Sequence, residues 1–197
     1  MKIAIFASGN GSNFEVLAQN FQRKSFKENE LALLFCDHPD AYVLKRAKKY
    51  HVPTETFTIK ECQNKVAYEQ KILNILKKYQ IDLIALAGYM KVIGSTILDV
   101  YEGRIINLHP SYLPEFQGLH AIERAYEDHL KNGRTQTGVT LHYIDAGLDT
   151  GPIIKQQHVP IYPHDSLAQL ENRIHTVEHK LYPQVLKEIF QKMEEKE

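Results

Sequence analysis

Short runs of β-branched and other apolar residues alternate along the first half of the chain with longer stretches whose apolar positions recur every three or four residues. The short runs are typical of buried strands and the longer stretches of amphipathic helices. Their alternation predicts βαβ units around a mostly parallel sheet. The predicted strands cover residues 3–7, 31–36, 54–57, 82–87 and 104–108, and the predicted helices cover 13–22, 41–50 and 60–80.

The second half of the chain has a different order of elements. A helical pattern over 119–131 ends at Gly133, and two β runs follow over 137–143 and 152–159. The segment between these runs, "IDAGLDTG", is long for a tight hairpin and rich in turn formers, so we expect a functional loop there. Further on, Pro183 should kink or restart a helix. The apolar stripe of that helix consists of Leu167, Leu170, Ile174, Val177 and Leu181.

Length, charge and cysteine content narrow the class of protein. The 197 residues fit a single domain over 1–197. Because 24 basic residues balance 24 acidic ones, the chain lacks the net positive charge that general nucleic-acid binding needs. Cys36 and Cys62 are the only cysteines, which suits a reducing compartment. The opening apolar run is shorter than a signal-peptide core, and no apolar stretch is long enough to span a membrane. We therefore expect a soluble, cytoplasmic protein.

The segment "IINLHPSYLP" carries the first candidate chemistry. Alternate residues of a strand face the same side, so Asn107 and His109 should share one face while Leu108 turns into the core. Pro110 should stop the strand and leave both side chains at its carboxyl end, where ligands bind in open α/β sheets. The residues alone allow a second interpretation, in which Asn107 caps a turn and His109 is a satisfied loop histidine.

A glycine-rich loop, "SGNGSN", lies between the first predicted strand and the first predicted helix. Main-chain N–H groups and the helix dipole can hold a phosphate at such a place. The loop is not a dinucleotide fingerprint, because Phe14 stands where the third glycine is needed, and it lacks the Gly-Lys-Ser/Thr of a Walker loop. The alternative is a simple turn in which Ser12 or Asn13 caps the helix.

The segment "HTVEH" matches the HxxEH pattern of inverted zinc peptidases through His175, Glu178 and His179. A catalytic zinc site needs a third protein ligand. In those peptidases a glutamate well downstream supplies it, and too little chain follows His179 here. We therefore favour a polar flank beside the apolar stripe, and no metal.

The loop "IDAGLDTG" offers two carboxylates, Asp145 and Asp149. A carboxylate beside His109 would raise the pKa of the imidazole and orient it, giving a general acid or base that works near neutrality. Asn107 could then donate to a developing oxyanion. No serine or cysteine elbow accompanies these residues, so we expect direct transfer to an external nucleophile rather than a covalent enzyme intermediate.

Taken together, the motifs "SGNGSN", "LAGYMKVI", "INLHPSYLP", "TGVTLHYIDAGLDTGPII" and "EHKLYP" closely resemble the phosphoribosylglycinamide formyltransferases, a family of folate-dependent enzymes of purine synthesis. The resemblance runs from Ile3 to about Pro183. It implies an α/β fold of three layers, Rossmann-like, with a seven-stranded, mostly parallel mixed sheet. It also implies transfer of the formyl group of 10-formyltetrahydrofolate, a co-substrate, to the amine of glycinamide ribonucleotide through a tetrahedral intermediate.

The resemblance assigns a role to each matching position. Asn107, His109 and Asp149 match the catalytic residues. Gly11, Ser12 and Asn13 match the loop that binds the ribonucleotide phosphate, and Glu178 matches a carboxylate that contacts the glycinamide. The residues that match the folate pocket are Lys65, Met90, Lys91, Val92, Ile93, Asn107 and Asp145, of which the two lysines stand where well-known members carry arginine. The Leu113-Pro114 bond matches a cis peptide of relatives.

Two other functions remain open at this stage. Much of the catalytic motif is shared across the formyltransferase superfamily, so a deformylase that hydrolyses 10-formyltetrahydrofolate, or an enzyme with another formyl acceptor, would carry similar residues. A non-catalytic nucleotide-binding module would use the glycine-rich loop but leave "NLHPSYLP" and "GLDTGPI" without a role. As partners we expect small-molecule substrates only, with no nucleic acid and no membrane, and a monomer or a homodimer.

Overall fold

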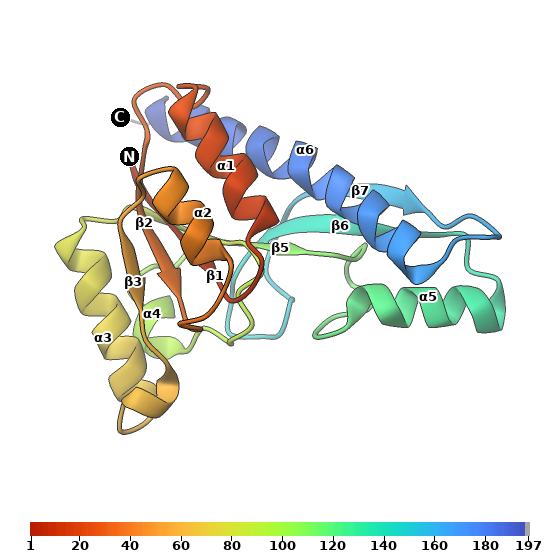
Figure 1. Cartoon of the computed structure of the whole chain (residues 1–197), viewed down its shortest axis with the longest axis horizontal. Helices are drawn as coiled ribbons and strands as arrows, with labels where there is room; N and C mark the ends of the chain where they lie inside the picture. The colour runs from red at the N-terminus through yellow and green to blue at the C-terminus, as the bar shows by residue number, and fades with distance from the viewer. Residues whose placement is uncertain (196–197) are drawn as a thin grey trace.

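A computed structural model of the chain describes residues 1–195 and is built on one seven-stranded sheet (Figure 1). The strand order is β3-β2-β1-β4-β5-β6-β7. Strands β1 to β5 run parallel, whereas β6 is antiparallel to both β5 and β7. The predicted mixed, mostly parallel sheet is confirmed. The strands are β1 Lys2–Ala7, β2 Glu30–Cys36, β3 Thr54–Thr56, β4 Leu83–Leu86, β5 Ile105–His109, β6 Gln136–Tyr143 and β7 Ile153–Pro160.

Helices cover both faces of this sheet, which makes the three predicted layers. Along β1, Ile3 and Ile5 pack in one hydrophobic cluster and Ala4 and Phe6 in the other, as the two-residue period of a strand requires. The first cluster is completed by α1, α2, α5 and α6, and the second by α3 and α4. The helices are α1 Ser12–Gln22, α2 Val43–Lys49, α3 Lys65–Lys78, α4 Ser95–Leu98, α5 Ala121–Asn132 and α6 Leu167–Glu194, with a 3₁₀ turn at Ile59–Glu61.

The helix predicted over 60–80 is wrong at its start. A 3₁₀ turn, Ile59–Glu61, comes first, and α3 begins only at Lys65. Asn64 caps α3, because its side chain accepts the main-chain N–H of Ala67 at 2.9 Å. Asparagine is among the preferred N-cap residues, and this cap outweighs the continuous apolar period that suggested one helix. The four-residue helix α4 was not predicted, because a single turn leaves no readable period.

The sequence predicts that Pro183 kinks or restarts the last helix, and the restart does not occur, since α6 continues through Pro183 as one element. Proline removes one intrahelical hydrogen bond, which costs about 3 kcal/mol in an isolated helix. Here Leu181, Tyr182, Val185 and Leu186 on both sides of the proline are buried in the first cluster. Tertiary packing of this kind supplies most of the stability of protein helices, and it holds α6 together across the break.

Among residues 1–195, no helix has both the length and the apolar character that a bilayer crossing needs.

Candidate active site

The end of β5 positions the first two predicted site residues. Leu108 packs in the core, while Asn107 and His109 point to the opposite face, toward the loop after β6. His109 is 5% exposed, because the turn that follows β5 folds over it. Asn107 pairs with Leu86 of β4 on one side and with His142 of β6 on the other. The pair therefore lies at the carboxyl end of the parallel strands, in the middle of the sheet.

The loop between β6 and β7 brings Asp149 to the same place. Its Oδ2 lies 3.4 Å from His109 Nδ1, and its Oδ1 lies 3.4 Å from Asn107 Nδ2. The main-chain N–H of Gly118 donates to Oδ2 at 2.8 Å. The three side chains that the sequence singles out are thus in contact, although Asp149 comes from a segment far along the chain from the other two.

A fourth residue of this cluster, His142, was not predicted. It is fully buried, with Nε2 3.2 Å from Asn107 Nδ2 and 3.6 Å from Asp149 Oδ1. Its Nδ1 lies 2.9 Å from the carbonyl oxygen of Tyr143 and must carry a proton, because a carbonyl only accepts. The sequence signal was the inward position of His142 in "TGVTLHY". The antiparallel register that sets it opposite Asn107 cannot be read from the chain.

The same reasoning fixes the tautomer of His109. Its Nε2 lies 2.9 Å from the carbonyl oxygen of Phe116, so Nε2 carries a proton in every ionisation state. The nitrogen that gains and loses a proton is Nδ1, which faces Asp149. A proton on Nδ1 therefore lies between the imidazole and the carboxylate.

The pKa of His109 corrects the sequence-based expectation. Burial lowers this pKa below its ordinary value, and it outweighs the Asp149 carboxylate and the Phe116 carbonyl, which act to raise it. For Asp149, burial acts to raise the pKa, but hydrogen bonds from His142 and Gly118 and the charges of the two histidines bring it below its ordinary value. The resting site at neutral pH is therefore a carboxylate beside a mostly neutral imidazole.

Among residues 1–195, seven non-glycine residues have positive φ, and three of them lie around this cluster. Phe116, His120 and Asp149 have φ angles of 53°, 58° and 54°, and Gly118 has a φ of 81°. Left-handed conformations of non-glycine residues are uncommon and cluster at functional sites. The loop after β5 also contains the Leu113-Pro114 peptide, which is cis, as the resemblance implies.

The glycine-rich loop leaves the N-terminus of α1 open. The cap residue is Gly11, which has no side chain, so the alternative in which Ser12 or Asn13 caps the helix is wrong. Gly11 has a φ of 75°, and a Cβ there would lie 2.3 Å from Val43 Cγ2. Only glycine fits this close approach to α2. The first main-chain N–H groups of α1 lack partners within the helix and are available to an anion.

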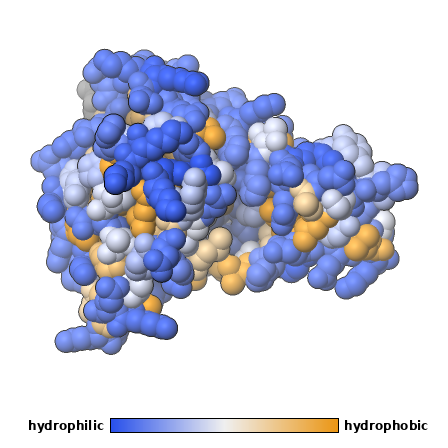
Figure 2. All heavy atoms as spheres, in the orientation of Figure 1, coloured by the Kyte–Doolittle hydropathy of each residue, from blue (hydrophilic) through white to orange (hydrophobic). Residues whose placement is uncertain are grey.

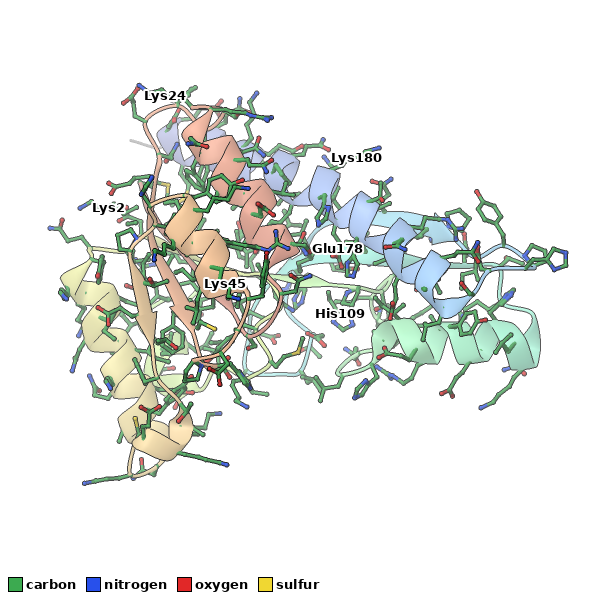
Figure 3. The ribbon with its side chains drawn as sticks, viewed as in Figure 1. Lys2, Lys24, Lys45, His109, Glu178 and Lys180 are labelled. Carbon is green, nitrogen blue, oxygen red and sulfur yellow. The ribbon has the colours of Figure 1, made fainter. Side chains whose placement is uncertain are left out.

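Glu178 of α6 lies beside this helix end. Asn13 Nδ2 donates to its Oε2 at 2.9 Å, and His175 Nδ1 lies 2.9 Å from the same oxygen. Glu178 is 4% exposed, and its hydrogen bond with His175 raises the pKa of that histidine. Figure 3 shows Glu178 and His109 in the central part of the molecule, on α6 and at the end of β5. Within residues 1–195, no group of three His, Cys, Asp or Glu side chains is arranged to hold a metal ion.

The segment after β4 presents two apolar side chains to solvent. Met90 and Val92 are 60% and 61% exposed, whereas Ile93 is buried in the second cluster. The segment is fixed at both ends, since Ser8 Oγ accepts the N–H of Met90 and Glu69 accepts the N–H of Gly94. Figure 2 shows hydrophobic residues gathered at the lower middle of this face, where Figure 1 places the loops after β4 and β6.

The remaining predicted residues have protein partners of their own. Lys91 Nζ lies 3.8 Å from the buried carboxylate of Asp37, and Lys65 Nζ lies 3.7 Å from Glu69. Asp145 accepts hydrogen bonds from the N–H of Gly147 and the hydroxyl of Thr150, and so closes the loop that carries Asp149.

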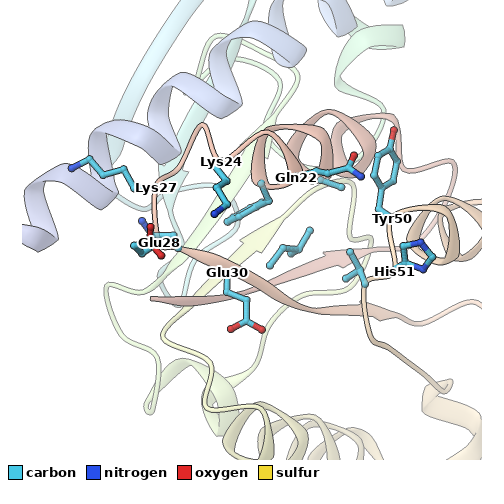
Figure 4. Close-up of a pocket in the computed structure, with 12 residues that line it drawn as sticks. Gln22, Lys24, Lys27, Glu28, Glu30, Tyr50 and His51 are labelled. Atoms are coloured by element: carbon cyan, nitrogen blue, oxygen red, sulfur yellow. The ribbon is translucent and has the colours of Figure 1, made fainter.

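A surface pocket elsewhere on the molecule contains none of the predicted residues. It lies between the ends of α1 and α2 and the start of β2, and Lys24, Glu30, Tyr50 and His51 line it (Figure 4). This is the amino end of the strands, opposite the edge where α/β sheets bind their ligands. The candidate active site is therefore the cluster around His109.

Comparisons with known proteins identify the family of the chain. The model of the formyl transferase family matches residues 1–186. A phosphoribosylglycinamide formyltransferase of Bacillus subtilis (strain 168) is 47% identical over 188 residues, covering 95% of this chain and 94% of that protein.

Solved structures give the same result. A glycinamide ribonucleotide transformylase 1 from Geobacillus kaustophilus is 49% identical with a TM-score of 0.91, over 96% of this chain and 98% of the other. A phosphoribosylglycinamide formyltransferase from Streptococcus pneumoniae TIGR4 is also 49% identical, with a TM-score of 0.88 over the same shares. On the matched motifs, the shared sheet and the similarity over nearly the whole length, the chain belongs to the formyl transferase family, among the phosphoribosylglycinamide formyltransferases.

Proposed function

We propose that the protein transfers the formyl group of 10-formyltetrahydrofolate to the amine of glycinamide ribonucleotide, a step of purine synthesis. The observation that carries this proposal is the contact of Asn107, His109 and Asp149 at the carboxyl end of β5. That contact supplies an oxyanion donor, a proton carrier and a charge that holds the proton carrier in place. The family membership supplies the identity of the two substrates.

The ribonucleotide phosphate binds at the N-terminus of α1, on the main-chain N–H groups of Gly11, Ser12 and Asn13. The open helix end and its dipole support this assignment. Glu178 takes the glycinamide part. A carboxylate that is buried and already hydrogen-bonded to Asn13 and His175 is held in one orientation, which suits recognition of an N–H donor of the substrate.

The folate binds against the segment 90–93 and the loop that carries Asp145. Exposed apolar side chains at Met90 and Val92 provide a surface for a flat aromatic ring, and Ile93 contributes through its main chain because its side chain is in the core. Lys65 and Lys91 attract the acidic tail of the folate as point charges. They lack the two-pronged donor geometry of arginine, so they orient that tail less strictly.

The reaction begins when the amine of the glycinamide attacks the formyl carbon. The carbonyl electron pair moves onto the oxygen, and Asn107 Nδ2 stabilises the oxyanion that forms, joined by the imidazolium of His109 once that ring has taken the proton of the attacking amine. Asn107 now makes only long contacts, 3.2 Å to His142 and 3.4 Å to Asp149, so its amide can turn to a better acceptor at small cost.

Collapse of the tetrahedral intermediate breaks the bond between the formyl carbon and the folate nitrogen. The attacking nitrogen loses a proton and the departing nitrogen gains one, so no net proton is consumed. His109 Nδ1 is the protein group that exchanges this proton, directly or through a water held by Asp149. A neutral resting imidazole accepts the proton, and the neighbouring carboxylate stabilises the imidazolium while it exists.

The test is formyl transfer from 10-formyltetrahydrofolate, followed by folate absorbance with and without glycinamide ribonucleotide. Turnover that depends on the ribonucleotide supports the proposal. Equal turnover without it, with release of formate, would instead identify a hydrolase, and absence of turnover in both mixtures would contradict formyl transfer to this acceptor.

The role of Asn107 has its own test. Loss of one oxyanion donor costs about 10²–10³ in kcat, so Asn107→Ala should fold normally and turn over about that much more slowly. Near-normal turnover of this variant would remove Asn107 from the mechanism. The single domain over 1–197, the cytoplasmic location and the choice between monomer and homodimer stay predictions from the sequence.

A further inference from the structure

The guanidinium of Arg124, in the first turn of α5, donates hydrogen bonds to two consecutive main-chain carbonyls. Its Nη2 donates to the carbonyl oxygen of Phe116 at 2.8 Å and to that of Gln117 at 2.5 Å. These are the peptides of the loop that folds over β5. Arginine at a helix start is unusual in electrostatic terms, because a cation there opposes the helix dipole. The local sequence therefore gives no reason for this residue, and its contacts must be explained by the loop that it holds.

An ordinary ion pair does not explain Arg124 either. No carboxylate within residues 1–195 lies within 4.0 Å of its guanidinium, whereas Arg134, just after the C-terminus of α5, pairs with both Glu115 and Asp128. The Nε of Arg124 is buried and has no hydrogen-bond partner in this part of the chain. A buried donor without a partner is costly, so the side chain is held by what its other end binds.

The two carbonyls lead directly to both ionisable residues of the catalytic cluster. The Phe116 oxygen that Arg124 binds also accepts the Nε2 proton of His109 at 2.9 Å. One residue beyond Gln117, the N–H of Gly118 donates to Asp149 Oδ2 at 2.8 Å. The backbone between them has positive φ at Phe116 and Gly118, and strained loops of this kind persist only where the surroundings hold them.

We propose that Arg124 is a positioning residue of the formyl-transfer reaction, which sets His109 and Asp149 at their working distance by clamping the peptides of Phe116 and Gln117. The expected effect on kcat rests on the proposed function, whereas the clamp itself rests on the contacts alone. Arg124 touches neither substrate in this arrangement. It acts through the loop, and its charge acts on the imidazole.

Three charged or titratable groups from three elements surround His109. Asp149 comes from the loop after β6, His142 from β6 itself and Arg124 from α5. Burial has the largest effect on the pKa of His109 and lowers it, and the positive charge of Arg124 adds to that lowering. Removal of this charge should therefore raise the pKa of His109, whereas a lysine in the same place should leave it nearly unchanged.

The test compares Arg124→Met, Arg124→Gln and Arg124→Lys with a matched control, Arg134→Met. Arg134 lies on the face of the Phe116 ring, 4.8 Å from its centroid, but binds neither clamped carbonyl, so its loss removes a cation beside the same loop without opening the clamp. Two readouts are taken on each protein. One is the titration of the His109 ring followed by NMR, assigned with a His109→Asn variant, and the other is kcat and KM for both substrates. Thermal melts establish that each variant is folded.

Arg124→Met should lower kcat by about 10- to 100-fold with KM changed by less than about twofold, since misplacement of a reacting group by about 1 Å costs up to 10²-fold. The Arg124→Met and Arg124→Gln variants should both raise the pKa of the His109 ring. If one of them fails to fold, the other still provides the test. Lys should keep the pKa and an intermediate kcat.

Either of two results would overturn the proposal: an unchanged His109 titration in the folded Met or Gln variant, or an equal loss of kcat in Arg134→Met. The titration needs no turnover, so it tests the role of Arg124 even if the wild type transfers no formyl group. Absence of transfer in the wild type would refute the proposed function instead.

Discussion

Replacement of Asp149 by asparagine isolates the charge of the catalytic cluster. Asparagine has nearly the same shape, its carbonyl can still accept the N–H of Gly118, and it tolerates the left-handed φ of 54° at this position. The fold should therefore survive. What is lost is the negative charge 3.4 Å from His109 Nδ1.

The size of the effect follows from that distance. Two unit charges 3.4 Å apart attract by about 5 kcal/mol at an effective dielectric constant of about 20. Asp149 has only 9% of its side chain exposed, so solvent screens the pair little. Each 1.36 kcal/mol is a factor of ten in rate, which gives a loss of about 10³- to 10⁴-fold in kcat if the imidazolium forms on the path. An Asp-to-Asn change in the serine protease triad lowers kcat by a similar factor, about 10⁴.

The assay is steady-state formyl transfer at saturating concentrations of both substrates. KM should change little, because Asp149 is used in the transition state, and the pKa of His109 should fall further once the carboxylate that raises it is gone. Asp128→Asn provides a control for the same chemical change, since Asp128 pairs with Arg134 on the surface of α5. A loss of kcat below about tenfold in Asp149→Asn, or an equal loss in the control, would show that no imidazolium beside Asp149 carries the reaction.

Three further predictions concern stability and binding. Tyr182 is fully buried and donates to a main-chain carbonyl of β4 at 2.9 Å, so Tyr182→Phe should cost about 1–3 kcal/mol in urea unfolding, and no loss would mean that water satisfies that carbonyl. Hydrogen bonds from Arg173 lower the pKa of Asp165 from 3.8 to about 2, so this pair stabilises the fold above pH 4 and is lost as the pH falls from about 4 to 2. Asp165→Asn should reduce the melting temperature at pH 7 far more than at pH 2, and equal losses at both pH values would exclude the pair as the cause. Gly11→Ala should weaken ribonucleotide binding at least tenfold, because Gly11 has a positive φ and an added Cβ would collide with Val43. Calorimetry measures this affinity, and a second substitution in the same chain, Val43→Ala, should restore part of it.

Most elements were predictable because their signals are local. The residues that form β1, β2, β4 and β6 are either continuously apolar or apolar at alternate positions, and each predicted strand lies within about two residues of the observed one. Two features departed from the apolar pattern, for different reasons. Asn64 divided an apolar period that looked continuous through a local cap on the N–H of Ala67, whereas the core around Tyr182, a non-local effect, carried α6 through Pro183.

The residues of the candidate site were likewise predictable where the signal is local and missed where it is not. Alternation along β5 placed Asn107 and His109 on one face, and a loop rich in turn formers marked the region of Asp149. His142 was missed, because its place beside Asn107 depends on the antiparallel register of β5 and β6. Asp149 acts to raise the pKa of His109 as predicted, but the net shift is downward, because a neighbouring carboxylate can be inferred from sequence and the depth of burial cannot.

The sequence by itself determined the order of the strands, the glycine-rich loop before α1 and the family to which the motifs point, since each depends on residues close together along the chain. Only the tertiary structure decided which side chains meet. Asp149 reaches Asn107 across 42 residues, and Glu178 reaches Asn13 across 165. Contacts of that range are set by packing of the whole sheet and its helices, and the same packing fixes the desolvation that sets the charge of His109.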